Sequence, residues 1–465
     1  MVWCASSFPK VGRFEMTGAL RVLSRPGKGI SALFLGGLLL QTGFLHLVGR
    51  ATGDDLFSIV ISAALLAPFL IMILFLYPYT AALLIPLFVI IPGSTLGFTV
   101  AEYLLLAVLF VSLLRAMASG STGEAPKLIE AVFLIYVGWA ALSMSQVIDL
   151  RDGLEGLRRI ILLFLAFLVG RRIVGSTRTR QFILWFSVLP ILVALELAFV
   201  ILRSGYPISA LLTRVGALTS LGWGYSNFVA AVGTLPLACG IPLILYGRPG
   251  ERALGICAMF AAGFVSIATV SRGGTLVLGV ALLLALILEA RRRSILPMFL
   301  FAAMGSIYML SPFGQANLAR FVNPQDLGSV GARVVYFEKT WRVFREHWLL
   351  GIGPDQISYY TASFIDRNPH NIFLKNAVEL GVLGLGLYVL LLVLCFREAV
   401  SFQRRAVSPQ ERMVGLAFIL VLAMAVINAS FEPTLETSQF GIPFWMAVGA
   451  FAAVTRGTRS GEVES

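Results

Sequence analysis

The chain has 465 residues, of which 58% are hydrophobic and only 13% are charged. An ordinary soluble domain is less apolar and carries about twice as many charges, roughly 25%, so the composition excludes a soluble enzyme of this size. The apolar runs are continuous and reach the length of about 20 residues that a membrane-spanning helix needs. Alternating strands of about 10 residues, which a membrane barrel needs, are absent from the sequence. We therefore predict an all-α, polytopic transmembrane helix bundle.

The apolar runs predict 12 to 14 spans. The number is a range because the third run is short and interrupted by proline. The fourteen candidates are 30–48, 56–76, 80–93, 97–115, 128–146, 158–175, 181–202, 226–246, 252–270, 273–290, 294–311, 373–396, 413–430 and 440–455. Residues 30–455 then form a single membrane domain between a polar N-terminal segment, 1–29, and a polar tail, 456–465. We see no internal repeat of the kind found in many transporters.

The placement of lysine and arginine predicts the orientation of the bundle. With the N-terminus in the cytoplasm, the inner segments hold 22 of the 36 basic residues and the short outer loops hold seven. The other seven lie in a long outer loop, 312–375, which is too long to count in this rule. Both termini are therefore expected in the cytoplasm. The net charge of +12 reflects this topology and does not indicate nucleic-acid binding.

Three segments on the expected outer face are unusual. The first is 203–225, which contains Arg214, and the second is the tight turn Ser271-Arg272-Gly273-Gly274. In the third, the long loop 312–375, the stretch from Arg333 to Trp348 is predicted to be a helix with an aromatic stripe at helical spacing, opposite charged residues. The stripe consists of Phe337, Trp341, Phe344 and Trp348. Such a helix would lie flat on the membrane surface, either as a simple lid or as part of a site.

His370 lies where the long outer loop meets the next span. An imidazole has an unperturbed pKa near 6.5, which suits a general base that takes a proton from a hydroxyl. The alternative is an ordinary interfacial histidine bonded to a backbone carbonyl. Arg214, Arg272 and Arg333 are expected on the same face. Each guanidinium either reaches toward water or binds phosphate oxygens, and three of them near a histidine favour an anion site.

Other polar residues in the spans have a structural interpretation. Lys375 and Glu379 follow Asn371 at four-residue spacing on one helix face, so the lysine and the glutamate are expected to pair within the bundle. The four cysteines have no metal-ligand spacing, and no carboxylate cluster suggests a metal. We therefore predict no metal and no other cofactor.

The segment from His370 resembles a known motif. His370-Asn371 is followed by nine residues, then Gly381, two residues and Gly384. In O-antigen ligases, histidine followed by Asn, Ser or Gln precedes the same spacing to Gly and a small residue or Tyr. The Ser271-Arg272-Gly273 turn, the stretch 214–227 and the run 341–355 also look like the O-antigen ligase and polymerase superfamily of bacterial inner-membrane proteins. The resemblance covers about residues 205–395.

This resemblance implies a function at the periplasmic face of the inner membrane. Such enzymes transfer a glycan from undecaprenyl pyrophosphate to a sugar hydroxyl, without a metal and with inversion if attack is direct. His370 would deprotonate or orient the acceptor hydroxyl, and Arg214, Arg272 and Arg333 would bind the donor pyrophosphate. Supporting roles would fall to Asn371, Gly273, Gly381 and Gly384.

The sequence leaves the acceptor open. Ligation to lipid A-core is favoured by the spacing from His370 to Gly384, whereas an O-antigen or exopolysaccharide polymerase, with a lipid-linked repeat unit as acceptor, would share the same motifs. A lipid-linked sugar flippase would need polar residues along a path through the membrane, but here they gather on one side. A peptidoglycan glycosyltransferase of the shape, elongation and division family is disfavoured because its acidic site is not found in a matching outer loop.

Overall fold

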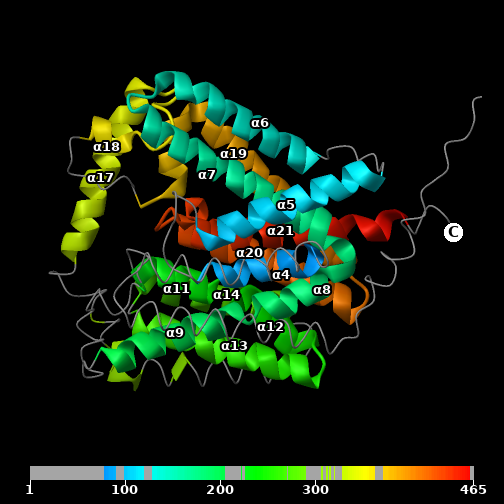
Figure 1. Cartoon of the computed structure of the whole chain (residues 1–465). Helices are drawn as coiled ribbons and strands as arrows, with labels where there is room; N and C mark the ends of the chain where they lie inside the picture. The colour runs from blue at the N-terminus through cyan, green and yellow to red at the C-terminus, as the bar shows by residue number, and fades with distance from the viewer. Residues whose placement is uncertain are drawn as a thin grey trace, which may run out of the picture. The chain divides into compact units, whose positions relative to one another are not determined.

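A computed structural model of the chain describes residues 78–90, 99–119, 128–204, 221, 226–269, 271–289, 327–361 and 370–460, with scattered positions between 305 and 319. Throughout these ranges the regular structure is helical and contains no strand, which confirms the predicted all-α class (Figure 1). The elements are α4 (Pro78–Phe88), α5 (Val100–Ser119), α6 (Leu128–Ser143), η1 (Met144–Gln146), α7 (Leu150–Leu168), η2 (Val169–Val174), α8 (Gly175–Phe186), α9 (Leu189–Arg203), α11 (Ser226–Thr234), α12 (Leu237–Tyr246), α13 (Pro249–Ala268), α14 (Arg272–Glu289), α17 (Leu327–Glu346), α18 (Ile357–Tyr360), α19 (Ile372–Arg405), α20 (Pro409–Ala429), η5 (Thr434–Glu436) and α21 (Ser438–Ser460).

Six helical stretches in the described part of the chain are long and apolar enough to cross a membrane. They are Leu128–Gln146, Arg178–Arg203, Ser226–Tyr246, Pro249–Ala268, Ile372–Arg405 and Pro409–Ala429, and each overlaps a predicted span. Shorter apolar helices at Tyr79–Phe88, Val100–Leu114, Arg272–Leu288 and Ser438–Val454 coincide with four more. The predicted spans 30–48 and 56–76 lie outside the described residues, and 294–311 lies almost entirely outside them.

The predicted span 158–175 has different limits in the structure. Helix α7 begins at Leu150, where the Asp149 carboxylate caps it by accepting a hydrogen bond from the backbone N–H of Asp152 at 3.0 Å. At its other end α7 passes into the π-helical turn η2 and then into α8 without a break. Charged residues in the first turns of α7 hid this part of the helix from an apolar window.

Close backbone contact holds α21 against α7 and η2. A Cβ atom on Gly170 would lie 2.0 Å from the carbonyl oxygen of Met446, and one on Gly449 would lie 2.1 Å from the carbonyl oxygen of Phe167. Glycines in these places let the two helices approach more closely than any side chain would allow, as is common between membrane helices.

Helix α19 is kinked near its start. Gly381 has φ +68° and ψ −174°, and the segment that follows α17 crosses the helix at this point. There the N–H of Val382 donates to the Trp348 carbonyl at 2.8 Å, and a Cβ atom on Gly381 would lie 2.1 Å from the Leu349 carbonyl oxygen. Only glycine fits both the left-handed conformation and the close crossing.

Helix α17 is the helix predicted in the long outer loop, and it packs against the start of α19 through Val343 and Phe344. Phe337 and Trp341, at 49% and 46% exposure, point away from this contact. The aromatic stripe is therefore split: Phe344 faces the bundle, whereas Phe337, Trp341 and Trp348 are exposed. The expectation that the outward face lies on the membrane stays a prediction.

Candidate active site

His370 directly precedes α19 and has a left-handed backbone, with φ +53°. The next residue, Asn371, caps the helix: its side-chain oxygen accepts from the N–H of Leu374 at 2.9 Å. Its side-chain nitrogen donates to the Ser430 carbonyl at 3.1 Å, at the end of α20. Asn371 therefore fixes both the start of α19 and the neighbouring segment that connects α20 to α21.

That connecting segment supplies the central carboxylate of the site. Glu432 is 6% exposed, and its Oε2 lies 2.8 Å from Nδ1 of His370. Its Oε1 accepts hydrogen bonds from Nη2 of Arg333 at 3.0 Å and from Nδ2 of Asn227 at 2.7 Å. A single carboxylate thus joins residues from the start of α11, from α17 and from the start of α19.

The partner on Nδ1 determines which imidazole nitrogen can act as a base. Where Glu432 is ionised its oxygen can only accept a hydrogen bond, so the tautomer that fits this contact carries its proton on Nδ1 of His370. In a neutral imidazole the lone pair then belongs to Nε2. In carboxylate–histidine pairs of this kind, the acid holds the imidazole in one tautomer and stabilises it once it is protonated. The arrangement is suited to general-base chemistry on a hydroxyl.

Helix α17 contributes two neighbouring side chains to the site. Arg333 binds Glu432, and Tyr336, one turn further on, places its ring nearly parallel to that of His370, with centroids 6.1 Å apart and an angle of 20° between the planes. Residues three apart lie on the same face of a helix, so this face of α17 covers the histidine and the carboxylate together.

The turn before α14 joins the site through Asn227. The Ser271 hydroxyl donates to the side-chain oxygen of Asn227 at 3.2 Å and accepts from the N–H of Gly274 at 3.2 Å. Arg272 follows at the first position of α14, where the helix N-terminus favours an anion. A Cβ atom on Gly274 would lie 3.1 Å from that of Ala230. Gly273, by contrast, has room for a side chain, so space does not require a glycine there.

The predicted site residues are therefore only partly brought together. His370 and Arg333 meet at Glu432, and Arg272 adjoins the Ser271 that binds Asn227. Arg214 lies outside the described residues.

The two motif glycines have a structural role in α19. Gly381 forms the kink described above, and a Cβ atom on Gly384 would lie 3.2 Å from Cδ1 of Trp139 on α6. The two glycines thus set the direction of α19 after His370, which gives Gly381 and Gly384 a positioning role.

Sequence reasoning missed Glu432 and Tyr336, and it gave no role to Asn227, the last residue of the stretch 214–227. The available signal for Glu432 was a short polar run between two apolar segments, on the expected outer face and containing two acids, 432 and 436. Within the described residues no group of three or more His, Cys, Asp or Glu side chains is arranged to hold a metal ion. The metal independence of the reaction stays a prediction.

Comparison with known families identifies the same region. Residues 257–389 match a family model described as O-antigen ligase. The matched range contains Arg272, Arg333, His370 and both motif glycines, but not Asn227 or Glu432. No curated protein matches the chain.

Proposed function

Because the chain belongs to the O-antigen ligase superfamily, we propose that it transfers a glycan from undecaprenyl pyrophosphate to a sugar hydroxyl at the periplasmic face of the bacterial inner membrane. The acceptor that we favour is lipid A-core, which would make the protein an O-antigen ligase. The observation that carries the proposal is the 2.8 Å contact between Nδ1 of His370 and Glu432, with Arg333 on the other carboxylate oxygen.

In this reaction His370 serves as the general base. Its Nε2 takes the proton of the acceptor hydroxyl while the hydroxyl oxygen attacks the anomeric carbon. The bond from that carbon to the pyrophosphate oxygen breaks, and the configuration inverts. Glu432 stabilises the imidazolium that forms, and its hydrogen bond fixes the direction of Nε2 throughout.

The arginines stabilise the departing pyrophosphate. Arg272 lies at the N-terminus of α14, where the helix dipole adds to its own charge. Arg333 binds Glu432 through Nη2, and a guanidinium carries five N–H donors, so one side chain can contact both a carboxylate and an anion. Together with Arg214 these groups would compensate charge where it develops, with no nucleotide or metal required.

A polymerase is the second candidate. An O-antigen or exopolysaccharide polymerase would use the same histidine, carboxylate and arginines, with a lipid-linked repeat unit in place of lipid A-core as the acceptor. Transport of a lipid-linked sugar is disfavoured because residues 257–389 match a family model described as O-antigen ligase.

An electrophoretic profile of lipopolysaccharide and lipid-linked glycan from a strain lacking this gene tests the proposal. The strain is complemented with wild type, His370→Ala or, as a matched control, His347→Ala, which removes a histidine at the end of α17 that contacts Tyr360. A ligase leaves bare core with long polymer on the carrier, whereas a polymerase leaves core with a single repeat unit. Full rescue by His370→Ala would contradict the proposal; rescue by His347→Ala is expected.

A further inference from the structure

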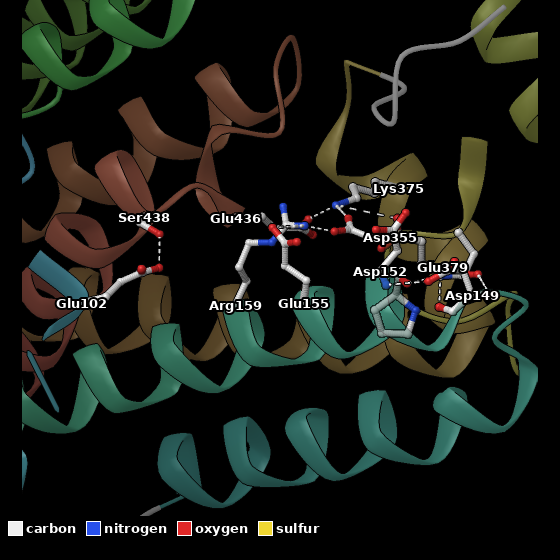
Figure 2. Close-up of polar contacts among 12 residues, drawn as sticks. Glu102, Asp149, Asp152, Glu155, Arg159, Asp355, Lys375, Glu379, Glu436 and Ser438 are labelled. Carbon is white, nitrogen blue, oxygen red and sulfur yellow. Dashed lines mark hydrogen bonds and ion pairs between the residues drawn. The ribbon is translucent and has the colours of Figure 1, made fainter. Parts of the chain in front are cut away.

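A second polar cluster lies one turn further along α19, and the proposed chemistry does not use it. Nζ of Lys375 is 3.0 Å from Oδ1 of Asp355 and 3.7 Å from Oε1 of Glu379, and it forms its closest ion pair with Glu436 (Figure 2). Lys375 is only 5% exposed. The expected pairing of Lys375 with Glu379 is confirmed, but the closest acids come from other segments.

Both polar clusters connect the same two pieces of chain. His370 and Lys375 lie at the start of α19, and their partners Glu432 and Glu436 lie four residues apart in the segment between α20 and α21. This segment therefore runs along the first turns of α19, held at one point by the histidine and at the next by the lysine. Any shift of Glu436 along α19 would also move Glu432 relative to the imidazole.

The lysine cluster is itself anchored to the rest of the bundle. Asp355, which binds Lys375, also forms an ion pair with Arg159 on α7 (Figure 2). The neighbouring Gln356 accepts hydrogen bonds from the N–H groups of Ile148 and Asp149, at 3.0 and 2.9 Å. The position of Lys375 is thereby set by α7 and by the connection between α6 and α7, both remote in sequence from the histidine.

We propose that the Lys375–Glu436 ion pair is a positioning device that sets the register of Glu432 against His370. The inference rests on the proposed function, in which Glu432 orients the catalytic imidazole. The physical reason is that a displacement of about 1 Å from the productive geometry can cost about 100-fold in rate. The ion pair holds its two segments together because separation would leave the Glu436 carboxylate, whose side chain is 14% exposed, without its cation.

The primary test is Glu436→Gln, which keeps the shape of the side chain and removes its charge. Lys375 then retains Asp355 and Glu379, so the fold keeps a compensated lysine. The matched control is Glu130→Gln, which removes the charge of a buried glutamate that pairs with Arg171 at 3.1 Å and with Arg172 at 3.4 Å. Glu130 lies in the first turn of α6 and Arg171 lies in η2, so the pair is remote from the connection between α6 and α7 that contacts Gln356.

The assay uses purified protein, the lipid-linked glycan that accumulates in the deletion strain, and lipid A-core or, for a polymerase, more lipid-linked glycan as acceptor. For Glu436→Gln we expect kcat to fall about 10- to 100-fold while KM for the donor changes less than about threefold. Lys375→Arg should retain more activity than Lys375→Met. If Lys375→Met does not reach the membrane, Glu436→Gln decides. A kcat for Glu436→Gln equal to that of Glu130→Gln would overturn the inference.

A double-mutant cycle separates positioning from general stability. If Glu436 acts through Glu432, adding Glu436→Gln to Glu432→Gln should lower kcat by less than about threefold more, whereas Glu130→Gln should add its full effect. Fully additive losses from Glu432→Gln and Glu436→Gln would overturn the inference while leaving the proposed function intact. Wild-type activity of Glu432→Gln would instead contradict the proposed function itself, and the inference with it.

Discussion

The first turns of α19 carry two polar clusters that have similar residues and different surroundings. In the first, the histidine side chain is 23% exposed and the arginine side chain 38% exposed. In the second, the lysine and its aspartate are 6% and 3% exposed. In the proposed mechanism a substrate hydroxyl would reach the first cluster, whereas the second is closed and its charges compensate one another. Access and a titratable imidazole, and not polarity as such, distinguish a site of chemistry from a site that holds the fold in place.

The largest expected effect is the loss of the imidazole. His370→Ala should lower kcat by about 100- to 10,000-fold, the usual contribution of a general base, with normal membrane levels. His347→Ala, at a position directly after α17, should stay within about threefold of wild type. The measurement is the rate of glycan transfer by the purified proteins. Equal losses in the two variants would remove the distinction between the two histidines.

Removal of the central charge should have the next largest effect. Glu432→Gln keeps the shape of the side chain but no longer favours the imidazolium, so kcat should fall about 100-fold. The loss should exceed that of Glu436→Gln, because Glu432 contacts the imidazole directly and Glu436 acts only through the backbone. Steady-state kinetics on both variants rank the two carboxylates. A larger loss for Glu436→Gln would reverse the roles assigned to the two clusters.

Arg333 binds Glu432 and is proposed to bind the donor pyrophosphate as well, and one substitution tests both contacts. Arg333→Met should lower kcat/KM about tenfold or more, through a higher KM for the lipid-linked donor as well as a lower kcat, because a charged hydrogen bond contributes roughly 1.5–3 kcal/mol. Arg342→Met is the control, since that arginine is exposed on the same helix and is 3.9 Å from its partner Glu338. A fall in kcat alone would mean that Arg333 acts on Glu432 and not on the donor.

Substitution of the glycines in the two motifs should change the stability of the protein by different amounts. In Gly381→Ala the new Cβ atom would clash with the backbone of the segment that crosses α19, and alanine would have to adopt a left-handed conformation. The substitution should therefore lower the free energy of unfolding by about 3 kcal/mol or more. Gly273→Ala has room and should change it by less than about 1 kcal/mol. Thermal unfolding in detergent measures both. A neutral Gly381→Ala would show that the kink is not needed.

The sequence predicted the parts of this molecule that depend on local pattern. The span at 373–396 and the all-α class follow from continuous apolar residues, and His370 with Gly381 follows from motif spacing. Hydropathy could not show the charged start of α7, because a capped polar turn does not look like a span. Nor could it reveal Glu432, whose contact with the histidine joins positions 62 residues apart and exists only after tertiary folding.

The reason for the motif glycine is likewise a tertiary one. Gly381 was singled out by resemblance, but its function depends on a segment some 30 residues earlier in the chain that crosses α19 at the kink. The prediction that Lys375 and Glu379 pair was correct as far as spacing on one helix allowed. The ion pairs of Lys375 with Asp355 and Glu436 could not be predicted, because they join segments that meet only in the folded bundle.

The most direct test of the central claim is glycan transfer by purified wild type, His370→Ala and Glu432→Gln in lipid nanodiscs. The donor is the lipid-linked glycan from the deletion strain, and lipid A-core is supplied as the acceptor. Wild type should attach the glycan to the core, His370→Ala should give no product above background, and Glu432→Gln should be slowed about 100-fold. Transfer by His370→Ala at the wild-type rate would contradict the assignment of His370 and Glu432 as the catalytic pair.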